Sequence, residues 1–234
     1  MDYDNDGRMD FLTGSIGGKV YLYRRKPNGT FALPEVLRRQ VHGFLGAGSE
    51  PISLGAGSAV AMADWFGRGK LDLFVGTGDG YVYLLPNEGT REKPVFGHYE
   101  RLKADSKVIM AEGGVAGPFV ADWDGDGKLD LVVGCGSGRV VCYRNVGANG
   151  QPQLAAGVTL VEPFPDGVNL SNSRSGARLP TRSALNAKVC VADWNGDGRP
   201  DLIVGDYWFG NGTPHGWVWV YLRAPAETAQ AKAE

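Results

Sequence analysis

Hydrophobic and polar positions alternate in short runs along this chain, and the same runs return four times. An apolar stretch ending in glycine occurs as DFLTG, DLFVG, DLVVG and DLIVG, at 10–14, 72–76, 130–134 and 201–205. A run that opens Gly-x-Val follows each of them, at 18–23, 80–85, 138–143 and 216–221. Runs this short, rich in Val, Tyr and Trp and bounded by Gly or Asn, are typical of antiparallel strands.

The repeat predicts an all-β fold. Three units begin with a further strand-like run that ends in Ala-Asp, at 60–64, 118–122 and 188–193. Units of about four strands at this spacing predict a β-propeller of four-stranded antiparallel blades, about four in this chain. The repeats lie near 1–57, 58–114, 115–186 and 187–223, and 224–234 is predicted to be a disordered tail.

The predicted strand counts of three, four, four and three leave the two ends of the row incomplete. The chain is then part of a larger propeller, or half of one that a second copy completes as a homodimer. A closed disc of four blades agrees less well with these counts. Open sheet edges favour association in either case.

Acidic residues are concentrated directly before the DLxVG runs. Thirteen of the 26 acids lie in the four loops there, with five of the 24 basic residues, so the rest of the chain has 19 basic residues against 13 acids. In the loop DWDGDGKLD, numbered from its first Asp, carboxylates stand at positions 1, 3, 5 and 9 (Asp122, Asp124, Asp126 and Asp130), and the Lys128 carbonyl stands at position 7. Calcium takes six to eight such oxygens, and a bound cation removes the repulsion between the carboxylates.

An EF-hand shares the DxDxDG start but needs a Glu at position 12 and flanking helices. Position 12 is Thr13, Val75, Val133 and Val204 in the four loops, and strand-like residues surround it. The EF-hand interpretation is therefore excluded.

The combination of DxDxDGxxD, DLxVG and GxVxxY from Asp2 to about Arg223 resembles the FG-GAP or VCBS-type repeat. Such repeats build the calcium-bearing propellers of integrin alpha subunits and of many secreted bacterial proteins. The resemblance implies that each loop joins the first and second strands of a blade and that the first strand is innermost. It also implies about three structural calcium sites. The expected ligands are Asp2, Asp4, Asp6, the Arg8 carbonyl and Asp10; the Asp122–Asp130 set; and Asp193, Asn195, Asp197, the Arg199 carbonyl and Asp201.

The second loop departs from this pattern. Phe66 and Arg68 replace the ligands at positions 3 and 5, which leaves only Asp64 and Asp72. Because a guanidinium pairs well with carboxylates, Arg68 is predicted to substitute for the cation, and no calcium is expected there.

Two long connections in the last unit are candidates for ligand binding. One carries Arg174, Arg178 and Arg182, and the other carries Tyr207, Trp208 and His215. Aromatic faces beside guanidinium groups suit a sugar, especially an acidic one. A solvated loop is the alternative for both.

Three functions remain open at this point. The first is a calcium-stabilised extracellular binding or adhesion module for carbohydrate or protein. The second is an enzyme like the polysaccharide lyases, with His42, His98, His215 or Tyr207 as the base. The third is a purely structural scaffold. The chain's composition favours neither nucleic-acid binding nor a membrane span, and its calcium loops favour a secreted, periplasmic or cell-surface location. Cys135, Cys142 and Cys190 are expected to be buried free thiols.

Overall fold

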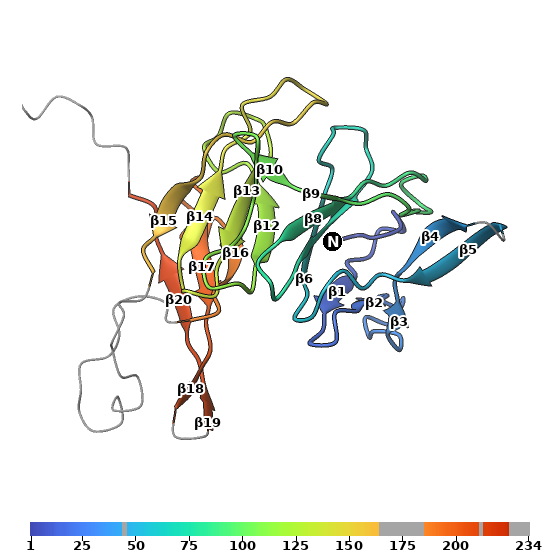
Figure 1. Cartoon of the computed structure of the whole chain (residues 1–234), viewed down its shortest axis with the longest axis horizontal. Coiled ribbons are helices and arrows are strands. Elements are labelled where there is room, and N and C mark those ends of the chain that lie inside the picture. Colours follow the sequence, from blue (N-terminus) through green and yellow to red (C-terminus); the bar gives the residue numbers. More distant parts are fainter. Residues whose placement is uncertain (44–45, 164–184, 211–212, 225–234) are drawn as a thin grey trace, which may run out of the picture.

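The computed structural model describes residues 1–43, 46–163, 185–210 and 213–224, and within these ranges it contains strands and no helix. Four small antiparallel sheets follow one another along the chain (Figure 1). The structure therefore confirms an all-β fold of about four propeller blades. The described residues form no helix that is long and apolar enough to cross a bilayer.

The sheets have the predicted three, four, four and three strands. Blade 1 consists of β1 (Phe11–Gly14), β2 (Val20–Tyr23) and β3 (Glu35–Val36). Blade 2 consists of β6 (Ala59–Ala63), β7 (Asp72–Gly76), β8 (Val82–Leu85) and β9 (Glu100–Arg101). Blade 3 consists of β12 (Gly117–Ala121), β13 (Asp130–Gly134), β14 (Val140–Tyr143) and β15 (Val158–Val161). Blade 4 consists of β16 (Lys188–Ala192), β17 (Asp201–Gly205) and β20 (Val218–Tyr221).

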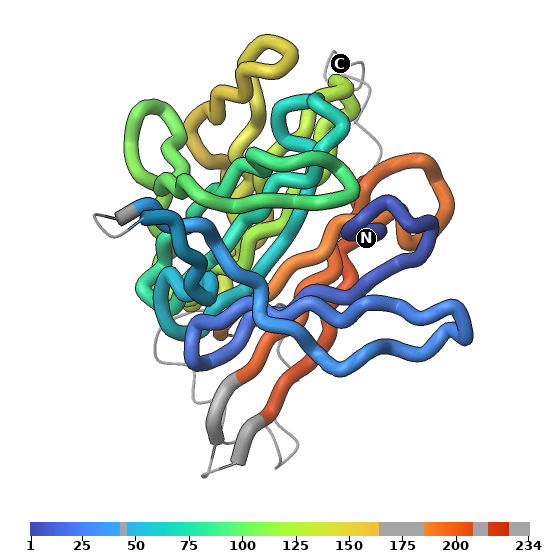
Figure 2. Tube along the Cα trace, turned by 90° about the vertical axis from the view of Figure 1, so that its right-hand side faces the viewer, coloured from blue at the N-terminus to red at the C-terminus, as the bar shows by residue number. Residues whose placement is uncertain are grey.

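Three hairpins lie between or beside the blades. They are β4 (Arg38–Gly43) with β5 (Gly46–Pro51), β10 (Lys103–Ala104) with β11 (Lys107–Val108), and β18 (Trp208–Gly210) with β19 (Thr213–His215). The last hairpin replaces a connection that the sequence alone predicts to be a loop. Figure 2 shows the blades from the side, with the blue blade 1 towards the viewer.

The hydrophobic core consists of three layers, one between each pair of consecutive blades. The DLxVG strand lies in the middle of its blade, and all five residues of β7 and of β13 are buried. In β7, Leu73 and Val75 pack towards blade 1, while Phe74 packs towards blade 3. A strand that is covered on both faces needs apolar residues at every position, which explains why these runs do not alternate with polar residues.

The glycine that ends the DLxVG run of each of the first three units lets the next blade approach closely. A Cβ at Gly76 would lie 2.3 Å from the Ala116 carbonyl oxygen, and one at Gly134 would lie 2.3 Å from that of Ala187. Both carbonyls immediately precede or open the first strand of the following blade. Glycine is required there because any side chain would push the two blades apart.

The cysteines agree with expectation only in part. Cys135 and Cys142 are buried free thiols, and burial raises their pKa values to about 11 and about 12. Cys190 is exposed, contrary to the expectation, because it lies on the face of blade 4 that no further described blade covers. The predicted tail from 225 onwards and the basic residues Arg174, Arg178 and Arg182 lie outside the described residues.

Lys188 of β16 has its ammonium group in the layer between blades 3 and 4. Its Nζ donates to the carbonyl oxygens of Val115 and Ala116, at 3.1 and 3.2 Å. Burial lowers the pKa of Lys188 from 10.5 to about 8, and the neighbouring Cys135 opposes this shift weakly. The folded protein therefore releases this proton more readily than the unfolded chain does.

This shift gives the first testable prediction. Between about pH 8 and pH 10.5 the unfolded state binds more protons at Lys188, so the contribution of this residue to stability rises with pH and is constant below that window. Relative to Lys188→Met, the wild type should gain on the order of 2 kcal/mol between neutral pH and the top of the window. Denaturant melts of both proteins across this range test it, and a pH-independent difference would contradict it. Tyr and Cys residues also titrate in this range, but they do so in both proteins, so their effect cancels in the difference between the wild type and Lys188→Met.

Candidate cation loops and a cleft between blades

The four acidic loops share one framework of hydrogen bonds. In each, the Asp at position 1 accepts hydrogen bonds from backbone N–H groups later in the loop; Asp122, for example, accepts from Gly125 and Gly127 at 2.8 and 2.9 Å. Asp2, Asp64 and Asp193 do the same. This aspartate holds the loop in a tight turn, as Asp side chains at turns commonly do.

The Asp at position 9 is buried in all four loops and connects the loop to the far end of the blade. Asp130 accepts hydrogen bonds from the backbone N–H of Trp123 at 3.0 Å and of Asn145 at 2.7 Å. Asp10, Asp72 and Asp201 repeat both bonds, with Tyr3 and Arg25, Trp65 and Asn87, and Trp194 and Arg223 as donors. Positions 1 and 9 therefore stabilise the fold directly.

This division explains which residues the second loop keeps. Asp64 and Asp72 retain the structural positions 1 and 9, while Phe66 and Arg68 occupy positions 3 and 5. The Arg68 guanidinium donates to Asp72 Oδ1 at 2.7 Å and lies 4.6 Å from the centre of the Phe66 ring. The positive charge of Arg68 thus lies beside the buried Asp72 carboxylate, where a bound cation would otherwise lie. The absence of calcium from this loop stays a prediction.

Position 3 brings a further carboxylate into the first and third loops. The carboxylate oxygens of Asp2, Asp4 and Asp10, and those of Asp122, Asp124 and Asp130, include atoms that all lie within 4.8 Å of one another. An arginine directly after β2 or β14 pairs with the position-3 Asp of the same blade: Arg24 pairs with Asp4, and Arg144 Nε lies 3.0 Å from Asp124 Oδ2.

The other two blades lack this pair at the equivalent positions. Where position 3 is Phe66, the residue equivalent to these arginines is Pro86, and where it is the neutral Asn195, the equivalent is Leu222. An arginine is therefore present only opposite an aspartate. This correspondence is visible in the sequence once the strands are aligned, yet sequence reasoning missed Arg24 and Arg144.

The remaining oxygens fit a hard cation. Asp4 Oδ2 accepts a hydrogen bond from Arg24, whereas Asp4 Oδ1 is buried without a hydrogen-bond partner. Carboxylate oxygens of Asp2 and Asp10 lie near the Asp4 carboxylate. Carboxylates and carbonyls on a tight loop are the donor set that calcium takes. The residues present therefore fit calcium in the first loop, and the third loop repeats their arrangement.

Position 5 lies outside both three-carboxylate clusters. Asp6 and Asp126 pair instead with the side chains of Arg8 and Lys128, and Asp197 pairs with Arg199 at 2.5 Å. Backbone and side-chain bonds from Lys128 lower the pKa of Asp126, and the Asn195 side chain lowers that of Asp197. Burial raises the pKa values of Asp72 and Asp130, against the backbone N–H groups that bind them.

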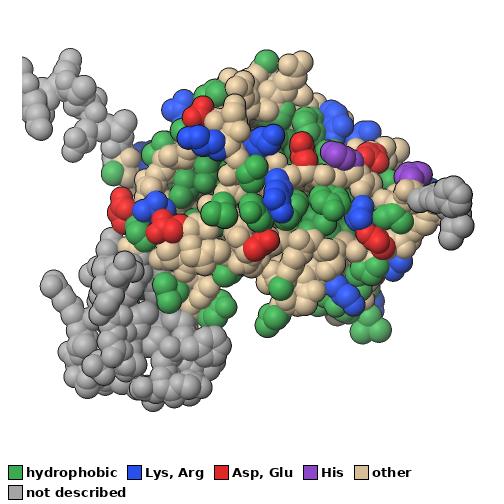
Figure 3. All heavy atoms as spheres, viewed as in Figure 1, with side chains coloured by type: hydrophobic (Ala, Val, Ile, Leu, Met, Phe, Trp, Pro, Cys, Tyr) green, Lys and Arg blue, Asp and Glu red, His purple; other side chains and the backbone are tan. Residues whose placement is uncertain are grey.

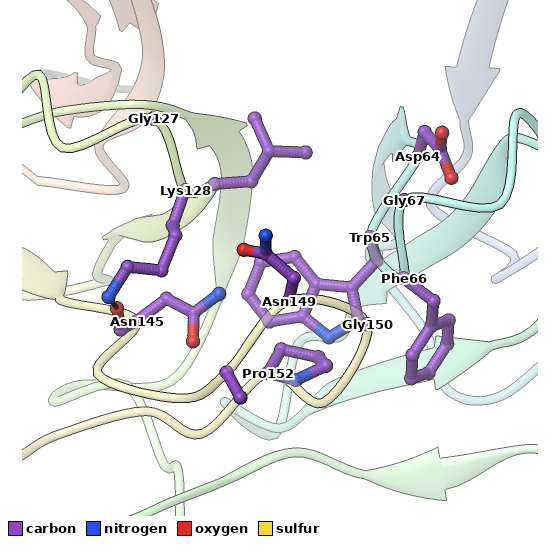
Figure 4. Close-up of a pocket in the computed structure, with 12 residues that line it drawn as sticks. Asp64, Trp65, Phe66, Gly67, Gly127, Lys128, Asn145, Asn149, Gly150 and Pro152 are labelled. Atoms are coloured by element: carbon purple, nitrogen blue, oxygen red, sulfur yellow. Dashed lines mark hydrogen bonds between the residues drawn. The ribbon is translucent and has the colours of Figure 1, made fainter.

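A cleft of 480 Å³ opens between blades 2 and 3 on the side of the acidic loops (Figure 4). Blade 2 contributes Trp65 and Phe66, and blade 3 contributes Lys128, Asn145 and a loop around Asn149. Figure 4 shows the Trp65 ring reaching from the blade 2 loop towards Asn149, while the Lys128 amine lies at Asn145. Of these residues the sequence pointed only to Phe66, as a replaced ligand, and to Lys128, for its carbonyl.

At each of the other two joints an arginine bonds to the acidic loop of the preceding blade. Arg91 of blade 2 donates to the backbone oxygens of Asp2 and Tyr3 in the first loop, and Arg223 of blade 4 donates to that of Trp123 in the third loop. The residue equivalent to Arg91 in blade 3 is Asn149, whose side chain is shorter. Among the described residues no arginine reaches the Trp65 carbonyl, so the joint between blades 2 and 3 stays open.

The other predicted site residues are dispersed. His42 lies in β4, His98 precedes β9, Tyr207 precedes β18 and His215 ends β19, and none of them lines the cleft. Tyr207 is exposed, and the side chain of Trp208 lies outside the described part of the structure. On the face seen in Figure 3, Lys and Arg side chains are interspersed with acidic ones and form no single basic patch.

Comparisons with known proteins include a solved structure and a family model that match this chain. A solved structure of an Agrocybe aegerita lectin, described as recognising non-reducing terminal N-acetylglucosamine, matches with 22% identity and a TM-score of 0.46. The match covers 93% of this chain and 50% of the lectin chain, so this chain spans half the length of that relative. No curated protein matches. The FG-GAP-like repeat model matches three times, over residues 2–75, 64–133 and 122–204, and each match runs from one acidic loop to the DLxVG strand of the next unit. The chain belongs to the FG-GAP-like repeat family.

Proposed function

We propose that this protein is a calcium-stabilised binding module that holds a carbohydrate in the cleft between blades 2 and 3. The observation that carries the proposal is the cleft itself. At two of three joints between blades an arginine fills the space beside the acidic loop, and at the third Asn149 leaves it open. An open joint beside two joints that each carry an arginine is a specific feature of this chain.

The lining suits a sugar better than an apolar ligand. A volume of 480 Å³ lies in the range of small-ligand sites. Phe66 is half-buried at one wall and supplies an aromatic surface, while Asn149 is exposed and offers both a donor and an acceptor. Sugars present exactly this mixture of C–H faces and hydroxyl groups. Lys128 and Asp64 bring one charge of each sign to the wall, which favours a neutral sugar over a strongly acidic one.

Calcium supports this function indirectly. The third loop provides Lys128 and Gly127 to the cleft and also carries the Asp122, Asp124 and Asp130 cluster. A cation bound there would fix the loop that forms one wall of the cleft, so that the cleft is ordered before the ligand arrives. Loops of this kind in extracellular modules bind calcium at about 10⁻⁴–10⁻³ M. We therefore place the protein outside the cytoplasm, in a compartment rich in calcium.

Glycan binding with one designed variant tests the proposal. Asn149→Arg introduces the side chain that Arg91 supplies at the joint between blades 1 and 2, and we expect it to reduce the affinity for the best neutral glycan about tenfold or more. A glycan array with calcium identifies that glycan, and isothermal titration calorimetry compares the proteins. Gln40→Arg, an exposed polar residue on β4, is the matched control and should bind as the wild type does.

Two results would count against the proposal. An array without any bound glycan would remove the assigned ligand class. Equal affinity of the wild type and Asn149→Arg would place the ligand away from this cleft. A thermal melt of each variant confirms that a loss of binding does not reflect unfolding.

A further inference from the structure

Consecutive blades in this chain join through two different faces. At the joint between blades 3 and 4, Val132, Val140 and Cys142 of blade 3 pack against Leu202 and Val204 of blade 4. We call the face that carries Val132, Val140 and Cys142 the forward face of blade 3. We call the face that carries Leu202 and Val204 the backward face of blade 4. The other two joints use the same strand positions, with Phe74 and Val82 in the forward face of blade 2 and Leu131 and Val133 in the backward face of blade 3.

Blade 4 presents a forward face that no described blade covers. The strand register places Cys190, Ile203 and Val220 side by side, with Val218 opposite Gly205. Val218 is 73% exposed, whereas its counterpart Val140 in blade 3 is fully buried. Leu222, just beyond β20, is exposed as well. The face therefore keeps apolar residues at the positions that are covered in every other forward face.

Blade 1 presents the opposite kind of face. Phe11 pairs with Tyr23 and Thr13 pairs with Tyr21 across β1 and β2, and these positions correspond to the backward faces of the other blades. Phe11 is 55% exposed, while its counterparts Leu73, Leu131 and Leu202 are buried. Its ring also contacts Tyr23 and Phe31, at centroid distances of 5.8 and 6.4 Å. The result is an exposed aromatic surface on the outer side of blade 1.

Gly205 shows that the free face of blade 4 has the shape of a joint. The equivalent Gly76 and Gly134 are needed because the following blade approaches within 2.3 Å of a Cβ at either position. At Gly205 the nearest atom is 4.0 Å away and belongs to Lys188 of the same blade. Nothing in the described chain requires this glycine, whereas a blade docked on the face would.

We propose that the forward face of blade 4 packs against the backward face of blade 1 of a second copy, as consecutive blades pack within the chain. The inference goes beyond the proposed ligand site and rests on the fold alone. A second copy is the appropriate occupant because one chain carries both faces and each repeats the residue pattern of the internal joints. Such a head-to-tail contact, made twice, closes a ring of two chains.

Mass measurement with two charge variants tests this contact. Light scattering after gel filtration should give twice the chain mass for the wild type. Val218→Glu on blade 4 and Phe11→Lys on blade 1 should each give the single mass. An equimolar mixture of the two variants should recover the double mass, because it reconstitutes one wild-type joint and opposes Glu to Lys at the other. Leu33→Glu, at an exposed apolar residue outside both faces, is the matched control and should keep the double mass.

The same experiment can overturn the proposal in three ways. A wild type at the single mass throughout a wide concentration range would refute the contact. Variants that lose the double mass but do not recover it on mixing would show that blade 4 and blade 1 do not face each other. If Val218→Glu lowered the melting temperature of a chain at the single mass, residues of the same chain would cover the face, and the inference would be wrong.

Discussion

Replacing Asp72 by alanine is expected to lower the free energy of unfolding by about 2–6 kcal/mol, because it leaves two buried backbone donors without partners. Asp72 is fully buried, and its carboxylate accepts from the N–H of Trp65 at 3.2 Å and of Asn87 at 2.8 Å. It also accepts from Arg68, whose charge would be left beside an apolar gap. Since the second loop is not expected to bind calcium, the loss should be the same with calcium and with a chelator.

Urea unfolding of Asp72→Ala and of Asp72→Asn measures this effect. The asparagine variant keeps the shape of the side chain but presents an amide donor to one of the two N–H groups, so a loss is expected for it too. Glu92→Ala, at an exposed acid of the same blade, is the matched control and should change stability little. A wild-type midpoint for both Asp72 variants would show that position 9 does not connect the loop to the blade.

Calcium is expected to stabilise the protein by about 2.7 kcal/mol for each occupied loop when its free concentration is about 100 times Kd. The first, third and fourth loops contribute to this increment. Asp124→Ala removes a position-3 carboxylate that makes no bond to a buried backbone group of the blade, so it should abolish one increment while leaving the calcium-free stability nearly unchanged. Thermal melts with calcium and with a chelator measure both quantities.

The second loop offers a gain-of-function test of the same prediction. Phe66→Asp with Arg68→Asp restores the four-carboxylate pattern around Asp64 and Asp72. Titration calorimetry should then detect one more calcium site than in the wild type. Without calcium this variant should be less stable than the wild type, because Asp72 has lost its cation. An unchanged number of sites, or a wild type that does not respond to calcium, would refute the metal assignment.

The sequence by itself determined the class of fold and the place of the acidic loops. Strand patterns and turn residues act locally, and they recur four times, so the number of blades and the three, four, four and three strands could be predicted. The fixed offsets of Asp122, Asp124 and Asp130 predicted a cluster of carboxylates, and the structure brings these three together. The ion pair between Arg68 and Asp72 joins two positions only four residues apart in the same loop, so it too is a local feature.

Only the tertiary structure decided which carboxylate oxygens bind the backbone of the loop and the blade and which do not. The second hydrogen bond of Asp130 comes from Asn145, beyond two further strands, and that of Asp201 comes from Arg223. No local pattern specifies such contacts, because they depend on how strands fold back within a blade. The sequence-based ligand set therefore treated positions 1, 3, 5 and 9 alike, although two of them stabilise the loop and the blade.

The cleft and the two free faces depend on how blades stack. From the sequence alone, Asn149 is an ordinary loop residue, and only the structure shows that it is the equivalent of Arg91. Phe11 and Val218 likewise look like ordinary strand residues, and only the structure shows that no described blade covers them. The stacking of blades depends on apolar packing between residues far apart in sequence, and a local sequence pattern does not specify which of these residues meet. The repeat thus specified the blades, and the contacts between blades specified the cleft and the two free faces.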